Sequence, residues 1–203
     1  MKVAKSRGLR ILAFTDHEDV RGYWEALDYS RELGVVLIPG MEVTLREAHV
    51  LLLGVDPRNP PQLPENTDIA EFLDRIHSEN IVTVLAHPFS RAGIFAYPVV
   101  KRVDVLRKFD LVEVLNGKSL MISNARANEL ARRIGRPGVA GSDAHVAMYV
   151  GAVRTIVEAE FVPEDVDEVL EGLRRGRVSV EGRTSLMQIA KHYVQELLCL
   201  LGF

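Results

Sequence analysis

The amino-acid sequence predicts an α/β fold, and two observations carry that prediction. Short apolar runs typical of strands alternate along the chain with longer amphipathic runs typical of helices. Histidine and aspartate residues follow several of the strand-like runs. The alternation implies parallel strands in a barrel or an open sheet, and polar residues at several strand ends favour the barrel.

Six strands are expected, each a short apolar run bounded by turn residues or charges. Pro39-Gly40 ends the second, and Val43 adds further extended structure after it. The proline-rich stretch 57–64 is interpreted as a connection within the domain. The expected strands cover residues 10–14, 35–38, 50–55, 81–85, 111–115 and 138–141.

Capping residues mark the ends of the expected helices. Gly34 closes a helix over residues 19–33, because glycine is favoured just past helix ends. Asp68 and Glu71 form a capping box before the apolar positions 69, 72, 73 and 76. Three more helices are expected to begin at Ser123, at Pro163 with a stop at Gly176, and at Ser185, where Gln188 completes another capping box.

Composition indicates one globular domain of ordinary size and excludes several classes of protein. The 203 residues carry a formal net charge of -3, so no basic surface marks a dedicated nucleic-acid binder, although a nucleic-acid substrate stays open. Cys199, the one cysteine, has no partner for an intramolecular disulfide and is expected to pack in a helix. Residues 1–7 lack the apolar core of a signal peptide, and residues 186–203 are too polar and too short to cross a bilayer. A cytoplasmic protein without a membrane partner is expected.

Four of the six histidines stand at expected strand ends beside carboxylates or prolines, which predicts a metal site. Imidazole and carboxylate ligands together suit zinc, manganese or iron better than calcium, which prefers oxygen. These four residues are His17, His49, His87 and His145. His77 and His192 lie in expected helices, where a solvated or packing role is the better interpretation.

Five motifs in chain order resemble the polymerase and histidinol phosphatase family, whose domains are called PHP domains. They are Thr15-Asp16-His17, Gly40-Met41-Glu42-Val43, His49, Ala86-His87-Pro88 and Gly141-Ser142-Asp143-Ala144-His145, and the resemblance covers nearly the whole chain. The resemblance implies a distorted (β/α)7 TIM-like barrel that holds up to three divalent metals at its carboxyl rim.

The resemblance also implies a role for each motif residue. Glu42 is expected to bridge metals, with His49 and His87 completing one site. Asp143 is expected in a second site, and His17 with His145 in a third. The catalytic residues are expected to be Asp16, Glu42, His87 and Asp143. Asp16 has an alternative role as the acceptor that fixes an imidazole tautomer.

Arg91, Asn116 and Lys118 are the residues expected to contact a phosphorylated substrate. Each belongs to or follows a motif-bearing segment, and the two cations suit phosphate. Surface solvation is the alternative for the cations. For Asn116 and Glu113, which share a strand, a structural hydrogen-bonding role is the alternative.

The sequence departs from the family pattern at its start, where the strand that ordinarily bears a His-x-His pair is absent. The expected architecture is a barrel domain over residues 1–184 that lacks the first β/α unit, with residues 185–203 as a helix packed on it. A late start, a true deletion covered by homo-oligomerisation at the open strand edge, and a degenerate relative are the three explanations.

The leading functional hypothesis is a metal-dependent hydrolase of phosphate esters that acts on a small phosphorylated metabolite or nucleotide. Clustered cations neutralise a phosphoester and lower the pKa of bound water toward ~7. One alternative is a catalytically impaired PHP-like scaffold or binding subunit in nucleic-acid processing. Another is an amidohydrolase-type enzyme that cleaves C–N bonds, because a barrel does not determine its reaction.

Overall fold

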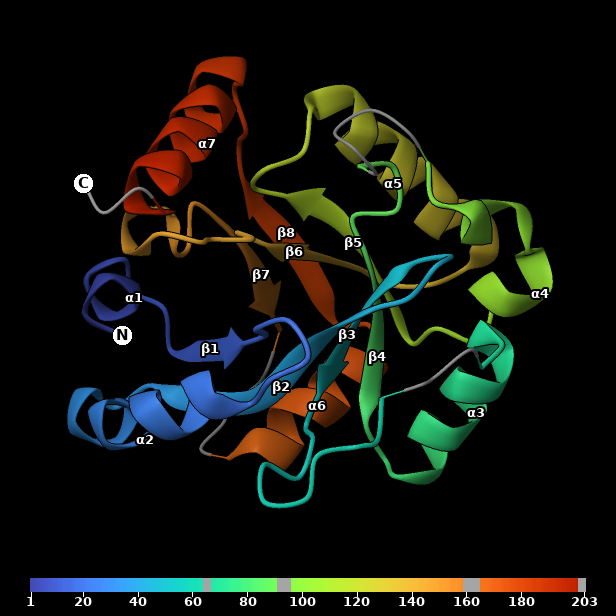
Figure 1. Cartoon of the computed structure of the whole chain (residues 1–203), viewed down its shortest axis with the longest axis horizontal. Helices are drawn as coiled ribbons and strands as arrows, with labels where there is room; N and C mark the ends of the chain where they lie inside the picture. Colours follow the sequence, from blue (N-terminus) through green and yellow to red (C-terminus); the bar gives the residue numbers. More distant parts are fainter. Residues whose placement is uncertain (64–66, 91–95, 159–164, 201–203) are drawn as a thin grey trace.

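The computed structural model describes residues 1–63, 67–90, 96–158 and 165–200. At its centre lies a six-stranded sheet, curled into a half barrel, in which the strands follow one another in chain order (Figure 1). The strands are β1 (Ile11–Phe14), β2 (Val36–Thr44), β3 (His49–Leu53), β4 (Val82–Ala86), β5 (Leu111–Asn116) and β6 (Gly138–Gly141). The predicted α/β class is confirmed, whereas the seven-strand count of the expected barrel stays a prediction.

One strand of the sheet runs against the others. β1 and β2 are parallel, as are β4, β5 and β6, but β3 is antiparallel to both β2 and β4. The expectation of parallel pairing is therefore wrong at β3. The reason is the short connection between β2 and β3, which Leu45 closes with a 2.9 Å hydrogen bond to the carbonyl of Ala48. A parallel pair would need a crossover of a dozen or more residues.

Two further strands, which the sequence analysis missed, form an antiparallel pair beside β6. They are β7 (Val153–Val157) and β8 (Val178–Gly182). The side chain of Thr155 joins this pair to the sheet, since its hydroxyl accepts from the amide of Ala140 at 2.8 Å and donates to the same residue's carbonyl at 3.0 Å. β8 is largely exposed, so it lacks the apolar run by which a buried strand is recognised.

The sequence signals locate most ends of the three helices α2 (Arg21–Leu33), α3 (Ile69–Ser78) and α5 (Met121–Ile134). Gly34 follows α2 in a left-handed conformation with φ of 61°, and Asp68 accepts a 2.8 Å hydrogen bond from the amide of Ala70 at the start of α3. The predicted cap at Ser123 is wrong. Leu120 is the last extended residue, so the chain is already helical when it reaches Ser123, which is buried.

The last two helices are α6 (Val166–Arg174) and α7 (Leu186–Leu200). The start predicted at Pro163 lies outside the described residues, and the carboxylate of Asp165 caps α6 by accepting from the amide of Glu168 at 2.9 Å. Ser185 caps α7 as predicted, because its hydroxyl accepts from the amide of Gln188 at 3.2 Å. Gly176, the predicted stop, follows α6 with φ of 69°.

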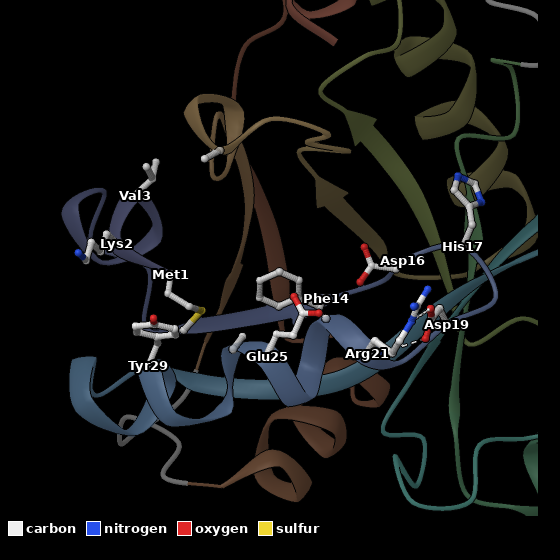
Figure 2. Close-up of a pocket in the computed structure, with 13 residues that line it drawn as sticks. Met1, Lys2, Val3, Phe14, Asp16, His17, Asp19, Arg21, Glu25 and Tyr29 are labelled. Carbon is white, nitrogen blue, oxygen red and sulfur yellow. Dashed lines mark hydrogen bonds and ion pairs between the residues drawn. The ribbon is translucent and has the colours of Figure 1, made fainter. Parts of the chain in front are cut away.

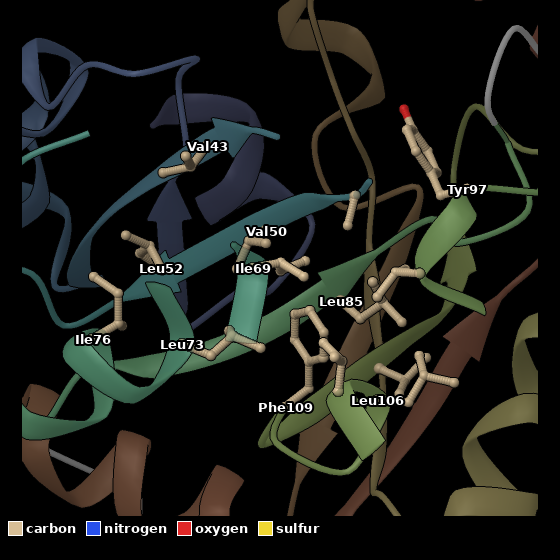
Figure 3. Close-up of a cluster of buried hydrophobic side chains, with 14 of the residues drawn as sticks. Val43, Val50, Leu52, Ile69, Leu73, Ile76, Leu85, Tyr97, Leu106 and Phe109 are labelled. Carbon is tan, nitrogen blue, oxygen red and sulfur yellow. The ribbon is translucent and has the colours of Figure 1, made fainter. Parts of the chain in front are cut away.

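Apolar side chains cover both faces of the sheet. Leu52, Leu73, Leu85 and Phe109 belong to one cluster, in which α3 covers the sheet (Figure 3). Val84, the neighbour of Leu85, belongs to a second cluster, formed with Ile38, Leu53, Val82, Leu111, Val139, Val169, Leu170 and Leu173. Alternate residues of β4 thus enter different clusters, and each fully buried leucine or phenylalanine stabilises the fold by ~1.5–3 kcal/mol.

The chain's first helix, α1 (Lys2–Ser6), is tied to the segment before β7. The guanidinium of Arg7 donates hydrogen bonds of 2.7 Å to the carbonyls of Met148 and Val150. Ala4, within α1, is fully buried. β1, which follows, is an end strand of the sheet (Figure 1). Within the described ranges, no helix has the length and apolar character that crossing a membrane requires.

Candidate metal centre and its surroundings

Three predicted ligands meet where β2, β3 and β4 lie side by side. Glu42 lies near the end of β2, His49 is the first residue of β3, and His87 directly follows β4. Because β3 is antiparallel to its neighbours, its first residue lies at the same edge of the sheet as their last residues. The register shows this directly, since Thr44 pairs with His49 and His49 pairs with Ala86.

One oxygen of Glu42 accepts hydrogen bonds from both imidazoles. Oε1 of Glu42 lies 2.7 Å from Nδ1 of His49 and 3.2 Å from Nε2 of His87. A ligand atom from each of the three residues lies within 4.8 Å of the other two. The Glu42 side chain is only 10% exposed. Two nitrogens and one oxygen that converge in a buried position fit zinc, manganese or iron. We call these three residues the Glu42 cluster.

The charges around the Glu42 cluster favour a cation. Burial raises the pKa of Glu42, but hydrogen bonds from His49 and His87 outweigh burial and keep the pKa below its ordinary value. Burial lowers the pKa of His87, but Glu42, Glu113 and Asp143 together raise it to about 9. Carboxylates that stabilise a proton on His87 also stabilise a metal cation bound in the same place.

His17 lies beside the Glu42 cluster and is more exposed than its members. Its Nε2 is 3.9 Å from Oε2 of Glu42, and its side chain is 52% exposed. Backbone hydrogen bonds hold this loop against β2, because the amide of Glu42 donates to the carbonyl of Asp16 at 3.0 Å and the amide of Glu18 donates to the carbonyl of Glu42 at 2.9 Å. The ring of His17 lies 6.5 Å from that of His145.

An open pocket of about 880 Å³ borders His17 (Figure 2). Asp16, Asp19, Glu25 and Arg21 give it a polar wall, whereas Met1, Phe14 and Tyr29 give it an apolar one. Burial, followed by the neighbouring charges of Asp19 and Glu25, raises the pKa of Asp16. The pocket provides room for a small molecule beside His17.

The buried carboxylate of Glu113 holds the backbone of His87 in place. Oε2 of Glu113 accepts from the backbone amide of His87 at 2.8 Å and from the side-chain amide of Asn116 at 3.2 Å. Glu113 is 3% exposed and burial raises its pKa to about 7. The same Asn116 amide also donates to Asp143 at 3.1 Å. Asn116 is 1% exposed. Glu113 and Asn116 thus make the hydrogen bonds of the structural role that the sequence left open as an alternative to substrate contact.

The remaining predicted ligands lie beside α7. Nδ1 of His145 is 3.4 Å from a carboxylate oxygen of Asp143, and its Nε2 is 3.7 Å from a carboxylate oxygen of Glu196. Nζ of Lys118 donates to Glu196 at 2.9 Å and lies 3.4 Å from Nδ1 of His145. Lys118 is therefore placed among predicted metal ligands, where the sequence predicted a phosphate contact. No sequence signal pointed to Glu196.

Two histidines outside the predicted set have different surroundings. His77 contacts Thr83 at 3.1 Å and Asp110 at 3.3 Å, away from the Glu42 cluster. His192 is 1% exposed and stacks on Tyr149 with ring centroids 4.1 Å apart. The packing interpretation of His192 holds, but its ring also lies 6.3 Å from that of His145. Arg91 lies outside the described residues.

Backbone strain collects at the same rim. Four described residues other than glycine have positive φ, and two of them are the predicted ligands His87 (φ 25°) and Asp143 (φ 49°). A third, Glu18, follows His17 directly, whereas Asn80 lies elsewhere. Such conformations cost on the order of 1–3 kcal/mol each and cluster at functional sites. The strain therefore supports a functional role for the rim.

Comparison with known proteins gives the same family as the motifs. A family model described as PHP-associated matches residues 121–178, which include Asp143 and His145. A probable phosphatase of Shewanella frigidimarina is 29% identical over 189 residues, a match that covers 77% of this chain and 73% of the relative. The chain is thus similar to PHP-family proteins, and the resemblance drawn from its motifs is confirmed.

Solved structures show the same fold. PsfC from Pseudomonas syringae has a TM-score of 0.71 at 19% identity, and the match covers 97% of this chain and 85% of PsfC. A two-domain protein from Bacteroides vulgatus that contains a predicted PHP-like metal-dependent phosphoesterase has a TM-score of 0.68 at 16% identity. That match covers 93% of this chain and 61% of the other. At such identities the likeness establishes the fold alone.

Proposed function

We propose that this protein is a metal-dependent phosphoesterase that hydrolyses a small phosphorylated metabolite or nucleotide. The observation that carries the proposal is the convergence of Glu42, His49 and His87 on one buried position beside an open pocket. The probable phosphatase among the relatives supports the reaction class. The identity of the substrate is expected to depend on the pocket that Asp16 and His17 line.

The Glu42 cluster would hold zinc, manganese or iron, with His17 close enough to extend it. When bound, such a metal neutralises phosphate charge and lowers the pKa of a water ligand toward ~7. Glu42 is suited to this role because its two histidine partners keep it anionic. His87 is held in place by the hydrogen bond from its amide to Glu113.

Asp16 is proposed to act on the substrate side of the cluster. Its carboxylate lines the pocket, and its raised pKa makes it readier to take up a proton than an ordinary aspartate. A carboxyl group so placed can hold or release a proton at the ester oxygen or at an attacking water. Asp143 is proposed as a further metal ligand beside His145, whose Nδ1 lies 3.4 Å from the carboxylate of Asp143.

The test is the hydrolysis of a generic phosphomonoester by the 203-residue chain, after exhaustive chelation and after the return of zinc, manganese or iron. Turnover should vanish on chelation and return with metal. Glu42→Gln keeps the shape of the side chain but removes its charge, and it should lower turnover by at least about 100-fold, since changes outside the ligand shell already cost 10–100-fold. Glu181→Gln is the matched control, because Glu181 is an exposed carboxylate on β8 that pairs with Arg154.

Three outcomes would count against the proposal. Turnover that survives chelation would exclude a metal-dependent reaction. Hydrolysis of amides but not esters in the same substrate panel would support the amidohydrolase alternative. A chain that binds no metal and turns over neither class would support a scaffold role.

A further inference from the structure

Helix α7 presents a pair of metal-ligating side chains to the rim of the sheet. His192 and Glu196 are four residues apart, so they lie on the same face of the helix. Much of the rest of α7 is apolar and faces outward, including Leu186, Met187 and Leu197. His192, by contrast, is 1% exposed. The polar face of α7 is therefore turned inward, toward β6 and the loop that follows it.

His145 completes a set of three ligands. One ligand atom from each of His145, His192 and Glu196 lies within 4.8 Å of the others, and Nε2 of His145 is 3.7 Å from Glu196. Ligands ~2.1 Å from a tetrahedral ion lie about 3.4 Å apart, so small side-chain movements would close the set around a metal. The ring of His192 is preorganised by its stack on Tyr149, and the lone pair of its Nε2, which accepts only a long 3.4 Å hydrogen bond from the amide of His145, can turn to a metal instead.

A cation already lies against this set. The ammonium of Lys118 is 2.9 Å from Oε2 of Glu196 and 3.4 Å from Nδ1 of His145, and its side chain is only 11% exposed. It also lies 5.0 Å from the ring centroid of Tyr193. The position thus stabilises positive charge, and an ammonium there must compete with a divalent ion.

We propose that His145, His192 and Glu196 form a divalent-metal site, separate from the Glu42 cluster, for which α7 supplies two of the three ligands. Two imidazoles and a carboxylate select zinc or another transition metal over calcium or magnesium. Lys118 occupies the place of the cation when no metal is bound. Metal that binds here ties α7 to the body of the protein. The site does not depend on the proposed phosphoesterase activity, and metal binding alone tests it.

The experiment is a zinc titration of the chelated full chain by calorimetry, with bound metal counted by mass spectrometry. Glu42→Gln removes the charge of the other cluster, and this variant should still bind one equivalent. Adding Glu196→Gln should weaken the remaining binding by about 100-fold, the loss expected for removal of a charged ligand. His77→Gln in the Glu42→Gln background is the matched control and should leave zinc binding unchanged.

Lys118→Met separates loss of a ligand from loss of the fold. It removes the competing cation, so zinc should bind about tenfold more tightly in the Glu42→Gln background, a gain that unfolding cannot produce. Zinc should also slow amide hydrogen exchange along α7 in the Glu42→Gln protein but not after Glu196→Gln is added. Equal zinc affinity with and without Glu196→Gln, or weaker binding after Lys118→Met, would overturn the proposal.

Discussion

Gly141 leaves the space that the buried carboxylate of Glu113 occupies. A Cβ atom at position 141 would lie 2.6 Å from Oε1 of Glu113, and apart from that carboxylate it would meet nothing within 4 Å. Gly141 does not have a positive φ, so alanine is compatible with its backbone. Gly141→Ala is therefore a clean way to displace the carboxylate that holds the amide of His87.

The expected cost follows from the bonds that the displacement breaks. A carboxylate is planar, so moving Oε1 also moves Oε2, which accepts from His87 at 2.8 Å and from Asn116 at 3.2 Å. Above about pH 7, where Glu113 is ionised, a hydrogen bond to its carboxylate contributes ~1.5–3 kcal/mol, and Glu113 is too buried for water to replace its donors. We expect Gly141→Ala to lower the free energy of unfolding by about 2 kcal/mol, or the melting temperature by roughly 4–8 °C.

Urea unfolding of a double-mutant cycle tests this reasoning. Glu113→Ala alone should destabilise the protein, because it leaves donors unpaired and creates a cavity. In the Glu113→Ala background, Gly141→Ala should cost almost nothing, since its only close contact is gone. If Gly141→Ala costs the same in both backgrounds, the clash with Glu113 is not its cause and the reasoning fails.

Two further predictions concern Asp16 and Asp110. A Cβ atom at Gly22 would overlap Oδ2 of Asp16, so Gly22→Ala should displace that carboxylate. Phosphoester turnover should fall while the circular dichroism spectrum stays unchanged. Full turnover would argue against a catalytic role for Asp16. Asp110 accepts hydrogen bonds from the amide and the hydroxyl of Thr83 at 2.8 and 3.0 Å. Burial raises the pKa of Asp110, but hydrogen bonds from His77 and Thr83 outweigh burial and lower the pKa overall. Because the folded pKa lies below the unfolded value of 3.8, Asp110 stabilises the protein above about pH 4 and loses this effect as pH falls through the folded pKa. The stability difference between wild type and Asp110→Asn, measured by urea unfolding, should therefore shrink as the pH falls below 3.8, and a constant difference would contradict this account.

The sequence was informative where function depends on residue type and local order. The motifs around His17, Glu42 and His87 predicted ligands that do lie close together, because each belongs to or follows a strand whose apolar run is recognisable. His49 was expected at the end of a strand but begins β3. His49 still lies at the predicted edge of the sheet. β3 runs antiparallel to β2 and β4, so its first residue lies beside their last residues.

What the sequence could not give depends on tertiary contacts. β8 is too exposed to show an apolar pattern, and α7 is apolar overall, so its polar pair carries no local signal. The meeting of Glu196 with Lys118, 78 residues away in the chain, is a long-range contact that no short motif records. Likewise, Gly141 is conspicuous only when the carboxylate of Glu113 is seen in the space beside it.

The two candidate metal positions differ in what holds their ligands. Glu42 and His49 are fixed by the register of three paired strands, so separating them requires opening the sheet. His192 and Glu196 are fixed only by the docking of one helix, chiefly through the Tyr149 stack and the Lys118 ion pair. Local opening of a single docked helix costs less than global unfolding. A metal at the α7 position should therefore exchange faster with a chelator than one in the Glu42 cluster, and the ratio of the two rates would measure how firmly α7 is docked.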